Sequence, residues 1–107
     1  MLFSPIENIK TVIASGHPSV ILEKSVELGA LLAGVNEETV NNEILYNNDV
    51  VTELNGDLSA TASKMIAQSK QAYMDYKISE GISKALNRTI TSLHKYADSL
   101  IAEKKVL

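Results

Sequence analysis

The chain has 107 residues, of which 45% are hydrophobic and 21% charged, and its net charge is −3. This composition is that of one soluble folded domain over residues 1–107 and argues against a disordered chain. The absence of cysteine excludes disulfide bonds, thiolate metal sites and cysteine nucleophiles.

The first predicted helix spans about residues 5–15. Ser4, Pro5 and Glu7 stand in the order of an N-terminal helix cap, and apolar residues then repeat at helical spacing. Gly16 is expected to end the helix, before a turn at the next proline. The segment does not indicate a signal peptide, so an intracellular soluble protein is the default expectation for localisation.

Two more short helices are predicted at about residues 19–34 and 37–46. Apolar residues cover most of the circumference of the first, and only Glu23, Lys24 and Glu27 are expected to face water. An asparagine followed by two glutamates is expected to separate the two helices. Because charges interrupt the apolar stretch, it falls short of the roughly 20 residues that cross a bilayer, and no membrane partner is expected.

A long amphipathic helix is predicted from about residue 58 to 104. Apolar residues recur there every seven positions, which indicates a heptad seam. The seam is strong from Leu86 onward and weak at Ser79 and Ser83. Its register continues past Gly81, which favours one helix, kinked near that glycine, over a hairpin. The predicted fold class is all-α, with short N-terminal helices packed near one end of a long C-terminal amphipathic helix.

The length of this helix predicts a protein interface. A helix over residues 58–104 would be on the order of 70 Å long, whereas a compact domain of this size has a radius of gyration of about 13 Å. Three short helices would cover only part of it, so another chain should bury the remaining seam. The predicted interface residues are Leu86, Ile90, Leu93, Ala97 and Leu100.

Charge is sorted along the sequence. Residues 1–56 carry two basic and eight acidic side chains, a net charge of −6, whereas residues 57–107 carry eight basic and five acidic ones, a net charge of +3. The basic half would therefore meet the acidic half of a neighbouring copy, or a polyanion. In the heptad frame a basic stripe lies opposite the apolar seam. Its residues, the candidates for nucleic-acid contact, are Lys70, Lys77, Lys84, Arg88 and Lys95.

The sequence contains no motif that indicates catalysis. Neither His17 nor His94 has a convincing metal-ligand partner at helical spacing. Ser92 and Lys95 match the spacing of some acyl-transfer enzymes, but the companion motifs are missing. No glycine-rich phosphate loop occurs. We expect no catalytic residue, no cofactor, no metal and no small-molecule substrate, and hence a protein that is not an enzyme.

The expected function is that of a non-enzymatic structural or adaptor subunit of a larger assembly, such as a viral particle. It would form a homo-oligomer, or join a larger complex, through the seam of the long helix. One alternative is an accessory nucleic-acid-binding protein that uses the basic stripe. Another is a small helical inhibitor or regulator that docks in a groove of a host protein.

Overall fold

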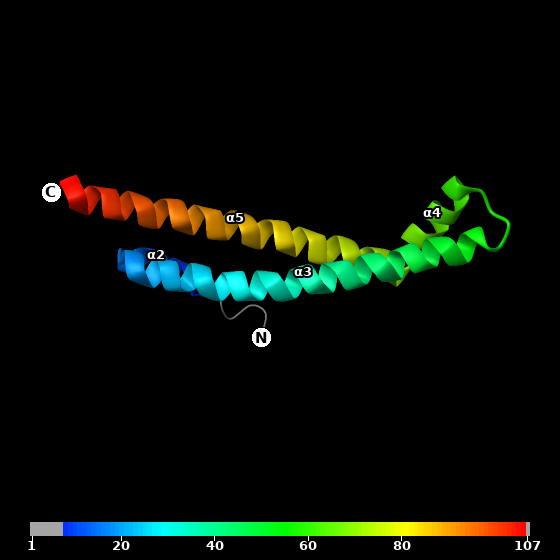
Figure 1. The fold of residues 1–107 in the computed structure, drawn as a ribbon, viewed down its shortest axis with the longest axis horizontal. Coiled ribbons are helices and arrows are strands. Elements are labelled where there is room, and N and C mark those ends of the chain that lie inside the picture. Colours follow the sequence, from blue (N-terminus) through cyan, green and yellow to red (C-terminus); the bar gives the residue numbers. More distant parts are fainter. Residues whose placement is uncertain (1–7, 107) are drawn as a thin grey trace. The chain divides into compact units, whose positions relative to one another are not determined.

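The structure is a computed structural model that describes residues 8–106, with side chains up to residue 103. Every regular element in this part of the chain is a helix (Figure 1). The prediction of an all-α fold with a long amphipathic C-terminal helix is confirmed. The helices are α2 (Ile9–Ser15), α3 (Pro18–Leu54), α4 (Ala60–Gln68) and α5 (Gln71–Val106).

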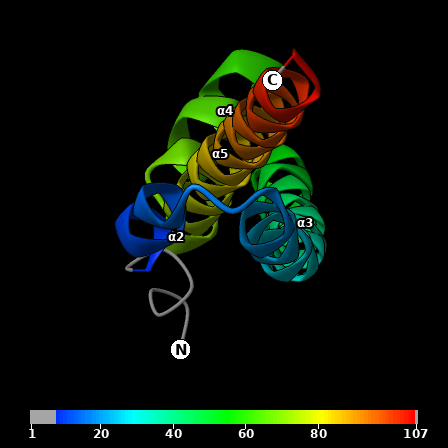
Figure 2. The same ribbon diagram turned by 90° about the vertical axis from the view of Figure 1, so that its left-hand side faces the viewer.

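The helices form two compact units. The terminal unit joins residues up to Ala33 with those from Lys84 onward, and the middle unit is Gly34–Ser83. Both α3 and α5 contribute to each unit, and within each unit the two helices run side by side in opposite directions (Figure 1). In the terminal unit, α2 and α3 lie on different sides of α5 (Figure 2). Each unit therefore contains chain from both the acidic and the basic half of the sequence.

Helix α2 ends as predicted. Gly16 has a φ of 66°, the left-handed conformation that glycine adopts without steric cost. Its backbone N–H donates to the carbonyl oxygen of Ile13 at 3.2 Å. Pro18 is the first residue of α3, where its missing N–H has no partner to lose. The cap predicted at Ser4, Pro5 and Glu7 lies outside the described residues.

The predicted boundary between helices 19–34 and 37–46 is wrong, because α3 continues through it for 37 residues in all. Burial explains the continuity. Ile21, Leu28 and Val35 recur every seven residues and are at most 3% exposed, so helix packing outweighs a weak cap signal. Asn36 does not cap a helix; its Oδ1 accepts a hydrogen bond from Ser83 Oγ at 2.5 Å.

Lys24 is also placed differently from the expectation that it faces water. Its side chain is only 5% exposed, on the inner face of α3. The Nζ atom lies 3.1 Å from Glu27 Oε2, and the carboxylate is itself about half exposed. The aliphatic stem is thus buried while the ammonium group reaches a partner at the surface.

The predicted long helix is divided at Ser69 and Lys70 into α4 and α5. Helix α4 begins at its own cap, where the Ala62 backbone N–H donates to Ser59 Oγ at 3.2 Å. It turns Ser63 inward and leaves Met65, which a seven-residue spacing from Leu58 would place on the seam, 68% exposed. Helix α5 continues through residue 81, so the favoured single helix, and not the hairpin, is what the structure shows there.

Candidate interaction surfaces

The predicted interface residues of the seam lie in or near the core of their own chain. Leu86, Leu93 and Ala97 are 3%, 2% and 0% exposed, and Ile90 and Leu100 are half-buried. The prediction assumed short N-terminal helices, but α3, with 37 residues, is as long as α5, with 36. Helix α3 therefore supplies the cover that another chain was expected to supply. These five residues do not form a free surface.

The middle unit has a polar interior. Its buried hydrophobic side chains are Val35 and Ala67, and its buried polar ones are Ser63 and Ser79. Asn42 Nδ2 donates to Ser79 Oγ at 3.3 Å, which links α3 to α5. Polar pairs of this kind fix the register between two helices but bury little apolar surface.

Three tyrosines add an aromatic cluster to the middle unit. The ring of Tyr46, on α3, lies 4.9 Å from that of Tyr73 and 6.2 Å from that of Tyr76, centroid to centroid. Lys77 Nζ lies 5.3 Å from the centre of the Tyr76 ring. These contacts hold α3 against α5. The ring of Tyr73 is thus engaged by another ring of its own chain.

The apolar side chains missing from the interior of the middle unit lie on its outside. Of the fourteen large hydrophobic side chains that are exposed in the described part of the chain, ten belong to this unit. Three of them, all more than half exposed, lie within about 40° of one another around α3, on the face turned away from Asn42 and Tyr46. We call them the outer α3 stripe: Val40, Ile44 and Val51.

The charged side chains near the outer α3 stripe on α3 are all carboxylates. The α3 segment 34–54 contains five acidic residues and no lysine or arginine. Glu37 and Glu43 lie on either side of the stripe and are exposed. Within residues 8–103 neither of them, nor Glu38, forms an ion pair, whereas Glu53 pairs with Lys70. The stripe is therefore an apolar surface with an acidic border.

The basic stripe is divided between the two units. Lys70 lies in the turn before α5, where its Nζ is 2.8 Å from Glu53 Oε1. The hydrogen bond to this carboxylate raises the pKa of Lys70 above its ordinary value of 10.5. Lys77 Nζ is 3.4 Å from Glu80 Oε1, and this contact likewise raises the pKa of Lys77. Both residues of the basic stripe that lie in the middle unit are thus engaged within it.

The other three predicted cations remain together on α5. They belong to the terminal unit and are exposed, on the face opposite Leu86 and Leu93. The heptad frame had predicted this placement, since α5 keeps its register through the unit. They are Lys84, Arg88 and Lys95.

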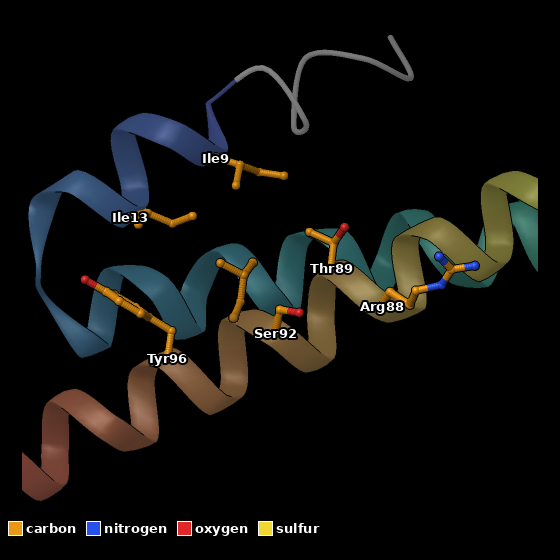
Figure 3. A pocket seen from close by; sticks show the side chains of 7 residues that line it. Ile9, Ile13, Arg88, Thr89, Ser92 and Tyr96 are labelled. Carbon is orange, nitrogen blue, oxygen red and sulfur yellow. The ribbon is translucent and has the colours of Figure 1, made fainter.

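A groove lies between α2 and α5, beside these cations. Ile9 and Ile13 of α2 point toward α5, and Arg88 and Tyr96 lie at opposite ends of the lining (Figure 3). The volume is about 360 Å³. The remaining lining residues, all on α5, are Thr89, Ser92 and Leu93. We call this site the α2–α5 groove; an aliphatic side chain fits its walls, and Arg88 can pair with a carboxylate next to that side chain.

Sequence reasoning missed this groove. The signal available was the pair Ile9 and Ile13, one helical turn apart. That spacing predicts an apolar face of α2 but does not say which helix the face will meet. The groove depends on where α2 docks on α5, a tertiary contact.

Two other kinds of site are absent from the described residues. Residues 8–106 contain no cluster of three or more histidine, aspartate or glutamate side chains that could hold a metal ion. In the same part of the chain, no helix has the length and apolarity needed to cross a membrane.

Comparison with known proteins gives no relative. No protein-family model matches the chain, no curated protein matches it in sequence, and no solved structure matches its fold.

Proposed function

We propose that this protein is a non-enzymatic structural subunit that self-associates within a larger assembly. The observation that carries the proposal is the reversed distribution of side chains in the middle unit, where the interior is polar and ten large hydrophobic side chains are exposed. Contiguous apolar patches on soluble proteins mark interaction sites. Cover of its outer face by another chain would add buried apolar area to the middle unit.

The outer α3 stripe is the centre of the proposed surface. Val40, Ile44 and Val51 are 55%, 52% and 53% exposed. A half-exposed valine or isoleucine has on the order of 1 kcal/mol still to gain from full burial. Three on one helix face therefore contribute about 3 kcal/mol to an association that the border charges would also have to favour. The proposed interface therefore lies on α3 and not on the seam of α5.

Sedimentation velocity over a concentration series tests this proposal. The wild-type chain is expected to grow in mass with concentration. Ile44→Asp places a charge in the stripe, beside Glu37 and Glu43, and should weaken self-association at least tenfold. The matched control is Val26→Asp, which also changes an exposed α3 valine (75%), but in the terminal unit; it should associate like wild type.

Helicity measured by circular dichroism should be the same in all three proteins, because both substituted side chains are more than half exposed. A wild-type chain that remains monomeric at every concentration contradicts the proposal. Equal weakening by Val26→Asp and Ile44→Asp would contradict the assignment of the stripe.

A second candidate function is contact with a single-stranded nucleic acid. It is favoured by the three exposed cations on one face of α5, Lys84, Arg88 and Lys95. Three phosphate contacts predict a slope of about −2 in a plot of log affinity against log salt. Lys70 and Lys77 belong to the other unit, where they pair with Glu53 and Glu80. Indifference to added oligonucleotide at low salt would remove this candidate.

A further inference from the structure

We propose that copies associate head to tail, with the outer α3 stripe of one copy seated in the α2–α5 groove of the next. This inference rests on the proposed self-association and names its two faces. The stripe belongs to the middle unit and the groove to the terminal unit. The occupant of the groove is thus a second copy of this chain.

The apolar parts of the two faces match. Val40 and Ile44 are one helical turn apart on the stripe, which places their Cβ atoms about 6 Å apart. Ile9 and Ile13 have the same spacing on the wall of the groove. A cavity of about 150 Å³ accepts a molecule the size of benzene, so a groove of about 360 Å³ has room for two aliphatic side chains.

The charged parts match as well. Glu37 and Glu43 border the stripe and are separated by about 9 Å along α3. Arg88 lines the groove, and Lys95, which is not a lining residue, follows it on α5 at a separation of about 10.5 Å along the helix. None of the four forms an ion pair within residues 8–103. Two carboxylates of one copy can therefore meet two cations of the next, which orients the contact.

The charge of whole units points in the same direction. The middle unit has three basic and eight acidic residues, a net charge of −5, and the terminal unit has seven basic and five acidic ones, a net charge of +2. Like units repel and unlike units attract, so the middle unit of one copy is drawn to the terminal unit of another.

The same charges disfavour a symmetric dimer. Pairing of two stripes would bring Glu37 and Glu43 against the same residues of the other copy, in a segment without a cation. Pairing of two grooves would bring Arg88 toward Arg88. A contact between two different faces leaves one free face at each end, so it leads to a ring or an open chain of subunits.

Two variants, each changed on a single face, test the inference. The stripe variant is Ile44→Asp and the groove variant is Arg88→Glu; both substituted residues are exposed. Each should self-associate at least tenfold more weakly than wild type. A 1:1 mixture keeps one intact stripe and one intact groove, so it should regain wild-type affinity but stop at a dimer. Lys64→Glu, an exposed charge reversal on α4, is the control and should behave as wild type.

The outcomes separate the two proposals. A wild-type chain that never associates overturns the proposed function and this inference with it. If wild type associates but the mixture does not recover, self-association stands and the head-to-tail contact is wrong. The inference is also wrong if either variant alone assembles with wild-type affinity, or if the mixture grows beyond a dimer.

Discussion

The Ser63 hydroxyl is a buried polar group that weakens the fold. Its Oγ atom has no hydrogen-bond partner among the described residues, and the side chain is 0% exposed. A buried hydroxyl without a partner loses its hydration and gains nothing in return. Ser63 stands in α4, one turn after Ser59, whose hydroxyl does have a partner.

The two serines of α4 should respond oppositely to alanine. Ser63→Ala removes the unsatisfied group and is expected to raise the free energy of unfolding by about 1 kcal/mol. Ser59→Ala removes the N-terminal cap and should lower it by about 1 kcal/mol. Urea denaturation measures both. A destabilised Ser63→Ala would show that the hydroxyl has a partner after all.

Three ionisable groups make the middle unit sensitive to alkali. A hydrogen bond with Glu53 raises the pKa of Lys70 above 10.5, and hydrogen bonds with Glu80 raise the pKa of Lys77 above 10.5 and that of Tyr76 above 10.0. The folded state thus holds these protons more tightly than the unfolded state. Their contribution to stability is complete below the ordinary values and is lost as pH rises through the raised ones.

The free energy of unfolding should therefore decline above about pH 10. Lys70→Met removes one of the three groups and should make the decline shallower, whereas Lys64→Met, at an exposed position of α4, should not. Urea denaturation at a series of alkaline pH values measures the slopes. Identical slopes in both variants and wild type would contradict the role of Lys70.

Two glycines show how far a helix depends on single positions. Gly81 stands within α5, and a Cβ atom built there meets nothing within 4 Å. Gly81→Ala should therefore stabilise the protein by about 1 kcal/mol. Gly16 has open space too, but its φ of +66° disfavours any side chain. Gly16→Ala should destabilise by about 1 kcal/mol.

Thermal unfolding followed by circular dichroism distinguishes the two variants: the midpoint rises for Gly81→Ala and falls for Gly16→Ala. Loss of stability in Gly81→Ala would mean that α5 bends at residue 81 in solution, as the predicted kink near that glycine implied.

Short sequence patterns predicted that helices form more reliably than they predicted where the helices begin and end. Gly16 predicted a terminus correctly, because a left-handed residue ends a helix whatever surrounds it. Asn36 did not mark a helix boundary. A cap contributes about 1 kcal/mol, and the burial of Leu28 and Val35 on one continuous helix face outweighs it. At the break after α4, Ser69 Oγ bonds to the Ile66 carbonyl at 2.6 Å. A serine alone is too common a signal to predict a break.

At the scale of the whole molecule, the sequence predicted which face of α5 is apolar but not what covers it. Leu86 and Leu93 are buried as the heptad frame implied. Their predicted contact with another chain stays a prediction; within the chain, α3 is long enough to cover them. The heptad frame also predicted that Arg88 and Lys95 lie on the exposed face of α5. It misplaced Lys70, because the helix is interrupted at that residue, between α4 and α5.

The unequal distribution of charge is found both in the sequence and in the structure. It is present between the two halves of the sequence, −6 and +3, and again between the two compact units, although each unit draws on both halves. The outer α3 stripe, with its acidic border, and the α2–α5 groove, which is lined by Arg88, are complementary in charge. Self-association and the location of its two faces are both predictions.

The most direct measurement is a disulfide cross-link between two copies, which is feasible because the chain has no cysteine of its own. Asn47→Cys marks the outer α3 stripe and Ser92→Cys marks the groove. When the two variants are mixed and oxidised, head-to-tail docking predicts that links between positions 47 and 92 predominate over links between identical positions. Random collision would give the mixed link in about half of the dimers, and that proportion, or an excess of 47–47 links, would contradict the account.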